Sequence, residues 1–247
     1  MNEATIRLYE ELNRFRPASE RKREVRKSFI GNPGVKDLIE SLGVPHTEVD
    51  LILVNGESVG FDYQVQHGDR IAAYPVFESL DVGSVSRVRT RPLREPRFIL
   101  DVHLGKLARL LRMLGFDTLY DNGWDDPEIV ERALADERII LTRDGGILKR
   151  REVTHGYLIR SDDPLRQAAE VLRRFDLADR IAPFARCMAC NGVIEPVSRE
   201  EVEDELLPGT REAFNEFFRC RSCGRIYWKG SHYDQMLEKI ETLLAPE

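Results

Sequence analysis

Short apolar segments alternate with helical patterns between residues 97 and 174, and this alternation constrains the fold more than any other feature. The segments RFIL, DTLY, RIILT and GYLIRS are each followed by a stretch with helical spacing or a helix-start signal. The first such stretch predicts a helix from Lys106 to Leu114 that ends at Gly115. Strands that alternate with helices form a mainly parallel sheet with helices on its faces. In such sheets the ligand site lies beyond the carboxyl ends of the strands.

Every predicted strand of this region carries an acid to that edge. The acids are Asp101 after FIL, Asp121 after TLY, Asp144 after ILTR, and Asp162 with Asp163 after LIRS. Carboxylates gathered at one edge repel one another unless a cation neutralises them, and oxygen ligands suit the hard ions Mg²⁺ and Mn²⁺. A divalent ion held in this way lowers the pKa of a bound water and stabilises charge on phosphoryl oxygens, which is the chemistry of phosphodiester hydrolysis.

The alternative for each of these acids, taken singly, is a helix cap. An aspartate at a strand end accepts hydrogen bonds from the first amides of the following helix. Asp162 or Asp163 before Pro164 is the clearest example, and Asp125 and Asp126 precede Pro127 in the same way. The metal hypothesis therefore depends on the convergence of several acids.

A row of basic residues follows Asp101. Lys106, Arg109 and Arg112 stand at positions i, i+3 and i+6, so we expect them to share one face of the predicted helix. We predict that Lys106 and Arg109 contact substrate phosphate, while part of the row could be solvated surface. Arg143 is a weaker candidate, because an extended strand would direct it away from the side of Asp144.

The charge of the chain is unevenly distributed. Its net charge is −6, yet residues 86–180 carry 19 basic against 17 acidic residues. Residues 1–80 carry 10 against 13, and residues 181–247 carry 8 against 12. The segment RVRTRPLREPR, residues 87–97, holds five arginines in eleven residues, and all but its last residue lie within a predicted linker, residues 82–96. We interpret the linker as a solvated tether, with contact to RNA phosphates as the alternative.

The four cysteines occur as two Cys-x-x-Cys pairs, Cys187 with Cys190 and Cys220 with Cys223, separated by 29 residues. This spacing predicts a zinc ribbon in which four thiolates complete a tetrahedron, so the Zn²⁺ is structural. Ribbons often bind nucleic acid or protein, and this one offers basic and aromatic groups. These are Arg219, Arg221, Arg225, Tyr227 and Trp228. The two aromatic residues could instead only pack the ribbon on its neighbour.

Compartment and membrane association are also constrained by the sequence. No run approaches the roughly 18 consecutive apolar residues of a membrane-spanning helix. The N-terminus MNEATIRLYEEL lacks the basic-then-apolar pattern of an export signal. We therefore expect a cytoplasmic protein with no membrane partner, in which paired cysteines bind zinc more readily than they form disulfides.

Residues 4–78 predict the order strand, strand, helix, strand, strand. With LVNG followed by HGDRIAAYPV, this region resembles the ubiquitin-like β-grasp sulfur carriers of thiamin and molybdopterin synthesis. Those carriers act through a free C-terminal Gly-Gly, whereas this chain continues through ESLDVGS. We therefore interpret the region as a docking unit for a protein partner, or as a packing module without a ligand.

Three longer motifs resemble a nuclease family. LDVHLGKLARLLRMLGFDTLYD, DDPEIVERALADERIILTRD and YLIRSDDPLRQ are similar to the Mut-seven C-terminal RNase family of PIN-like ribonucleases. In that family a nuclease domain carries a C-terminal zinc ribbon, and members with an N-terminal ubiquitin-like domain occur. The resemblance covers about residues 97–235.

The resemblance also implies roles for individual residues. It makes Asp101 the first metal carboxylate, Asp126 the intermediate acid and Asp144 the late one, with Asp162 or Asp163 as a possible further acid. Val102 and His103 stand where the family has a small residue and Met, which leaves the metal ligand intact but alters the local turn.

These observations predict an α/β protein with a PIN-like, mainly parallel sheet, an N-terminal ubiquitin-like β-grasp domain and a C-terminal zinc ribbon. The expected boundaries are 1–81 for the β-grasp domain, 82–96 for the linker, 97–182 for the nuclease domain, and 183–247 for the ribbon and terminal helix. The expected function is a ribonuclease that depends on Mg²⁺ or Mn²⁺ and takes RNA as its partner.

Two alternatives remain open. A phosphatase with an aspartyl nucleophile usually has a second Asp two residues after the first, where this chain has His103. A non-catalytic module that binds RNA or protein would use the ribbon and the β-grasp domain as platforms, with the acids as helix caps.

Overall fold

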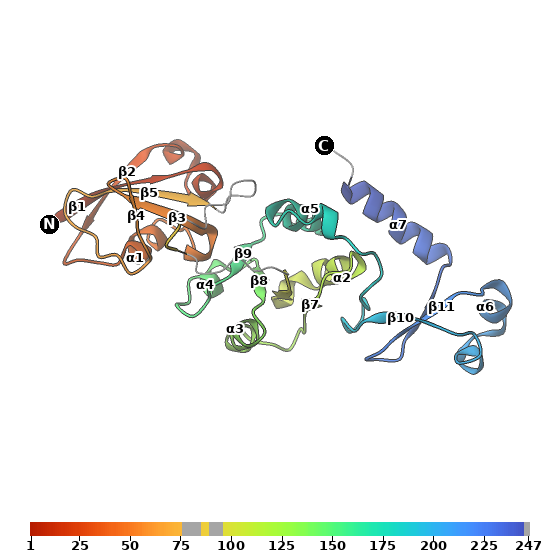
Figure 1. Cartoon of the computed structure of the whole chain (residues 1–247). Helices are drawn as coiled ribbons and strands as arrows, with labels where there is room; N and C mark the ends of the chain where they lie inside the picture. Colours follow the sequence, from red (N-terminus) through yellow and green to blue (C-terminus); the bar gives the residue numbers. More distant parts are fainter. Residues whose placement is uncertain (76–84, 89–95, 245–247) are drawn as a thin grey trace. The chain divides into compact units, whose positions relative to one another are not determined.

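The computed structural model describes residues 1–75, 85–88 and 96–244 (Figure 1). By its internal contacts the chain forms two compact units. The first contains Met1–Glu95 and Asp144–Leu158, and the second contains Pro96–Arg143 and Ile159–Glu247. Most of the predicted linker, including Arg89, Arg91 and Arg94, lies outside the described residues. The domain boundaries expected from the sequence stay a prediction.

The first unit contains a five-stranded sheet in the order β2-β1-β5-β3-β4. The strands are β1 (Asn2–Leu8), β2 (Glu24–Phe29), β3 (Val49–Val54), β4 (Glu57–Ser58) and β5 (Arg70–Pro75). β1 pairs antiparallel with β2 and parallel with β5, which is antiparallel to β3. Alternate residues of β1 are buried, and helix α1 (Val35–Glu40) adds Ile39 to the same core. The predicted element order is confirmed, with β4 as a short addition.

Residues 144–158 form helix α4 (Gly145–Leu148) and strand β9 (Gly156–Leu158) in this unit. Two buried polar residues of the short 3₁₀ helix His46–Glu48 hold this segment. Nδ1 of His46 lies 2.7 Å from Oε1 of Glu40, and Nε2 lies 2.7 Å from the carbonyl oxygen of Val153. The carboxylate of Glu48 accepts a hydrogen bond from the amide of Leu158 (2.9 Å). The contact of His46 with Val153 joins residues 107 positions apart, and that of Glu48 with Leu158 joins residues 110 positions apart.

The second unit contains a parallel sheet in which β6 (Phe98–Leu100) lies between β7 (Thr118–Leu119) and β8 (Ile139–Thr142). Every residue of β6 and β8 is buried, as expected for a sheet with both faces covered. The accompanying helices are α2 (Gly105–Met113), α3 (Asp126–Ala135) and α5 (Pro164–Arg174). The prediction of a mainly parallel sheet with flanking helices is confirmed.

The end of α2 requires a glycine. Gly115 has φ +94°, and a Cβ at this position would lie 2.1 Å from the carbonyl oxygen of Ala182. Both the left-handed backbone and the close approach exclude a side chain here. The helix therefore ends at Met113, within one residue of the predicted end at Leu114.

The C-terminal part of the second unit is a three-stranded antiparallel sheet of β10 (Ile194–Val197), β11 (Phe217–Cys220) and β12 (Ile226–Trp228). The segment between β10 and β11 carries the 3₁₀ helix Glu203–Glu205 and α6 (Pro208–Ala213), and α7 (Ser231–Leu244) follows β12 (Figure 1). Val202, Leu206 and Phe217 form a small separate core. Within the described ranges, no helix is both long enough and apolar enough to cross a membrane.

Candidate functional site

Asp101 directly follows β6, the central strand, and its side chain is held on several sides. The residue is only 5% exposed. Oδ1 accepts a hydrogen bond from the amide of His103 (2.8 Å), and Oδ2 accepts one from the amide of Arg143 (2.9 Å) and one from the hydroxyl of Thr142. A carboxylate offers about four acceptor positions. Three are thus used for orientation, which leaves acceptor capacity on Oδ1 for a further ligand.

The structure identifies helix caps among the other acids. Asp125, rather than Asp126, caps α3 by accepting from the amide of Glu128 (3.0 Å). Asp144 caps α4 through the amide of Gly146 (2.7 Å), and Asp163 caps α5 through the amide of Arg166 (2.9 Å). Asp126 is the first residue of α3, where it is exposed. The cap interpretation therefore applies to three acids, although a cap uses only part of the capacity of a carboxylate.

Arg143 and Thr142 have a larger part in this region than the sequence suggested. The backbone amide of Arg143 holds Asp101, while its guanidinium forms an ion pair with Asp162. Thr142 is fully buried at the end of β8 and gives its hydroxyl to Asp101. The only signal for Thr142 was a hydroxyl residue at the end of an apolar strand. His103 is exposed, and it reaches Asp101 through its backbone amide.

The predicted basic face of α2 is correct for two of its three members. Lys106 and Arg109 are exposed, but Arg112 is 4% exposed. Its guanidinium donates to the carbonyl oxygens of Thr118 (2.8 Å), Ala189 (3.1 Å) and Met188 (3.3 Å), and burial lowers its pKa. At about 3.6 residues per turn, position i+6 lies roughly 120° from position i, which turns Arg112 inward. The prediction of one shared face was therefore wrong for Arg112.

The four cysteine sulfurs of Cys187, Cys190, Cys220 and Cys223 lie within 4.8 Å of one another. The sulfurs of Cys187 and Cys223 are 3.7 Å apart, and those of Cys190 and Cys220 are 3.4 Å apart. A tetrahedron with metal–sulfur bonds of about 2.3 Å places sulfurs roughly 3.8 Å from one another. These four side chains therefore fit a structural Zn²⁺ with no open coordination position.

The thiols differ in their surroundings. Burial opposes the charged form of Cys187, but hydrogen bonds from the hydroxyl of Tyr227 and from the amides of Cys190 and Ala189 lower its pKa to about 6. Burial and the neighbouring thiols raise the pKa of Cys190 to about 12. A divalent cation would be needed to hold all four as thiolates, because deprotonating such a group otherwise places like charges side by side.

Polar contacts fasten the first cysteine pair to the parallel sheet. The amide of Thr118 in β7 donates to Oδ1 of Asn191 (2.8 Å), and Nδ2 of Asn191 donates to Asp117 (2.7 Å). Asp117 also binds Arg138 at 2.7 Å. Burial favours protonation of Asp117, but these two partners outweigh it and lower the pKa of its carboxyl group. Asn191 directly follows Cys190, and no motif around it predicts this role.

Comparison with known proteins identifies the class to which this arrangement belongs. Residues 96–240 match the family model described as the Mut7-C RNAse domain, and residues 1–81 match the model described as Mut7-C ubiquitin. The first match covers more than half of the chain. The chain therefore belongs to the Mut7-C RNAse domain family, and the resemblance seen in the sequence is confirmed.

Two individual proteins are similar to parts of the chain. The human "Exonuclease mut-7 homolog" is 36% identical over 123 residues, which is 47% of this chain and 14% of that protein. The chain thus spans about a seventh of the length of this relative. The crystal structure of H. volcanii small archaeal modifier protein 1 matches 31% of this chain and 100% of its own length, with 21% identity and a TM-score of 0.26.

Proposed function

We propose that the chain is a metal-dependent ribonuclease that hydrolyses RNA phosphodiester bonds through a PIN-like domain. The observation that carries this proposal is Asp101, a buried carboxylate at the end of the central parallel strand with an acceptor position left over. Membership of an RNase domain family supports the substrate class. A cytoplasmic location remains a prediction from the sequence.

Oxygen ligands fit Mg²⁺ or Mn²⁺. Asp101 would hold the ion, and the family resemblance adds Asp126 and Asp144, with Asp162 or Asp163 as a possible further acid. When bound, such an ion supplies an acidified water and charge stabilisation at the phosphate. The contribution of the chain itself is orientation, because Thr142 and the amide of Arg143 fix Oδ2 of Asp101.

The exposed cations of α2 support the binding of a polyanion. Lys106 and Arg109 are solvent-exposed on the helix that begins four residues after Asp101. Contacts from such side chains to phosphate oxygens position a strand without reading its sequence. We therefore assign Lys106 and Arg109 to phosphate binding next to the reacting group.

A second candidate function is a non-catalytic module that binds RNA or protein. The helix caps at Asp125, Asp144 and Asp163 favour it, because each acid already has a structural role. In that case the ribbon would bind RNA, and the ubiquitin-like region would dock a protein partner.

A cleavage assay with labelled single-stranded RNA and the purified chain distinguishes the ribonuclease from the non-catalytic binding module. We expect cleavage that requires added Mn²⁺ and is lost in Asp144→Asn, because asparagine caps a helix as well as aspartate and removes only the charge. Asp125→Asn is the matched control, since it makes the same change at a helix cap that the proposal does not assign to the metal. Zinc content is measured in every sample, so that loss of zinc is not mistaken for loss of Mn²⁺. RNA binding without Mn²⁺-dependent cleavage would favour the second candidate.

A further inference from the structure

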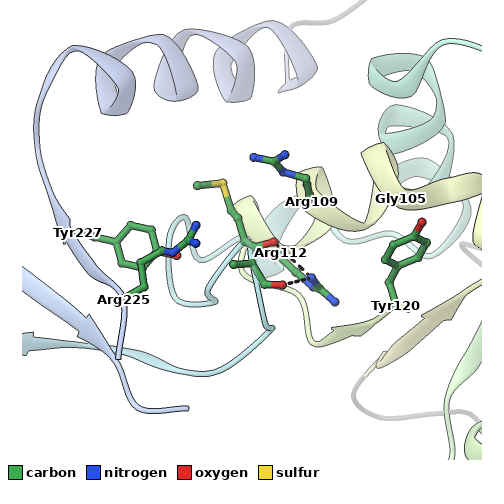
Figure 2. A pocket seen from close by; sticks show the side chains of 8 residues that line it. Gly105, Arg109, Arg112, Tyr120, Arg225 and Tyr227 are labelled. Carbon is green, nitrogen blue, oxygen red and sulfur yellow. Dashed lines mark hydrogen bonds between the residues drawn. The ribbon is translucent and has the colours of Figure 1, made fainter. Parts of the chain in front are cut away.

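A cavity of about 300 Å³ lies in the second unit between α2 and the ribbon (Figure 2). We call it the α2–ribbon pocket. Its lining includes Arg109 and Arg112 from α2, Tyr120 after β7, and Arg225 and Tyr227 from the ribbon. No acidic side chain is among the described residues that line it. Its size is at the lower end of the range for small-ligand sites.

Two of the arginines have no carboxylate partner in the described part of the chain. Arg109 and Arg225 are both exposed, and neither forms an ion pair within residues 1–75, 85–88 and 96–244. The other two arginines near Arg225 on the ribbon do form ion pairs. Arg219 pairs with Glu205, and Arg221 pairs with Glu195. The pocket therefore combines two unpaired guanidinium groups from separate elements, which is the arrangement that binds a phosphate.

Aromatic rings stand at two places around the pocket (Figure 2). The hydroxyl of Tyr120 donates to the carbonyl oxygen of Val102 (3.1 Å). Gly105 allows this ring to approach α2, since a Cβ there would lie 2.7 Å from the Tyr120 hydroxyl oxygen. Tyr227 is fixed by the contact of its hydroxyl with the sulfur of Cys187 (2.9 Å). Rings held in this way offer stacking surfaces for unpaired bases.

The two walls of the pocket are fastened to each other. Arg112 projects from α2 and donates to the carbonyl oxygens of Met188 and Ala189, between the first two cysteines. A guanidinium buried among carbonyl oxygens is costly to displace. The separation of Arg109 from Arg225 is therefore set before any ligand arrives, which lowers the entropic cost of binding.

We propose that the α2–ribbon pocket binds a phosphate group and an adjoining base of single-stranded RNA, with Arg109 and Arg225 on the phosphate and Tyr120 or Tyr227 against the base. The ribbon is then part of the substrate site as well as a folded appendage. The choice of RNA as ligand rests on the proposed nuclease function. The position of the pocket agrees with RNA as the ligand, because α2 begins four residues after Asp101. An RNA strand that reacts at Asp101 would therefore lie close to the pocket.

The test compares Arg225→Ala with Arg221→Ala in the full zinc-loaded chain. Binding of a labelled single-stranded RNA is measured by fluorescence anisotropy over a range of salt concentrations, without Mg²⁺ or Mn²⁺. We expect Arg225→Ala to weaken binding about tenfold. We also expect it to reduce the slope of log K against log salt by about 0.7, the value for one phosphate contact on a single strand. Arg225→Lys should keep most of the salt slope, and Arg221→Ala, which removes an ion-paired arginine from the same ribbon, should bind as the wild type does.

The possible results separate this inference from the proposed function. Equal binding by Arg225→Ala and Arg221→Ala would overturn the inference, even if the wild type cleaves RNA with Mn²⁺. Binding that depends on Arg225 in a chain that cleaves nothing would support the pocket and count against the nuclease. Absence of RNA binding by the wild type would overturn the inference outright. Zinc content and circular dichroism of Arg225→Ala show whether the ribbon is still folded.

Discussion

The cysteine cluster and the carboxylates at the strand ends are both places where the sequence predicts a metal, yet their side chains are arranged differently. The four sulfurs lie within 4.8 Å of one another, although the chain separates the pairs by 29 residues. Asp125, Asp144 and Asp163 instead bind amides two or three residues away. In the described part of the chain, the cysteines form the one group of three or more acidic, cysteine or histidine side chains at metal-binding distances.

The difference follows from what each side chain can do alone. An aspartate at the start of a helix gains a hydrogen bond from its own helix, so a strand-end acid has a stable role without a cation. A thiol is only a weak acceptor, so local amide contacts such as those of Cys187 with Ala189 and Cys190 do not explain why four cysteines converge. Paired cysteines that converge therefore indicate a ligand much more strongly than aspartates at helix starts do. Asp101 is the exception among the acids, because two of its three donors come from Thr142 and Arg143, about forty residues away.

If the four cysteines hold Zn²⁺ as we predict, loss of that ion should have the largest effect. Cys187→Ser removes one of the four candidate ligands, and we expect it to destabilise the ribbon by several kcal/mol, since metal binding is coupled to the folding of such domains. Zinc content and thermal unfolding measure this loss, with Ser222→Ala in the second cysteine pair as the control. A Cys187→Ser chain with normal melting temperature would show that the cysteine cluster is ordinary packing.

Removal of a single charge at the carboxylate edge should affect activity more than stability. We expect Asp144→Asn to lower RNA cleavage about a hundredfold, as for a ligand that contributes several kcal/mol of transition-state stabilisation. Thermal unfolding should be nearly unchanged, because the asparagine still caps α4. Equal activity of Asp144→Asn and Asp125→Asn would show that both residues act only as helix caps. The four cysteines would then be the one predicted metal site left in the described part of the chain.

Arg112 and Arg109 test the two faces of α2. Arg112→Ala leaves the carbonyl oxygens of Thr118, Met188 and Ala189 without their donor, and we expect a loss of about 2 kcal/mol in the free energy of unfolding. Arg109→Ala removes an exposed side chain and should change it by less than about 0.5 kcal/mol. Denaturant titration measures both. A similar loss for the two variants would contradict the buried position of Arg112.

The smallest effect should be the pH dependence at Asp117. Its carboxyl pKa is lower in the folded chain than the ordinary value of 3.8, because Arg138 and Asn191 outweigh the effect of burial. A lowered folded pKa adds stability above the unfolded value, and that stability is lost as the pH falls through the folded pKa. We expect the melting temperature to fall more steeply below about pH 4 in the wild type than in Asp117→Asn. Parallel curves for the two chains would contradict this role of Asp117.

Much of the fold could be predicted from local pattern. Helical spacing from Lys106 onward and Gly115 located α2 to within a residue, and apolar runs located β6 and β8. The cap at α3 was predicted only to within two neighbouring acids, and the structure selects Asp125 over Asp126. Local pattern could not show that Arg112 is buried, because spacing gives a direction around the helix and says nothing of which element packs there.

The sequence by itself determined the order of the elements, the family and the four cysteines that could hold a metal, because periodicity, motif order and cysteine spacing are properties of neighbouring residues. Only the tertiary structure decided which polar groups meet across the chain. His46 with Val153, Thr142 with Asp101, and Asn191 with Thr118 join residues 107, 41 and 73 positions apart. A buried polar group must find a partner wherever the packed core supplies one. That partner depends on how the elements pack in three dimensions, which local spacing does not record.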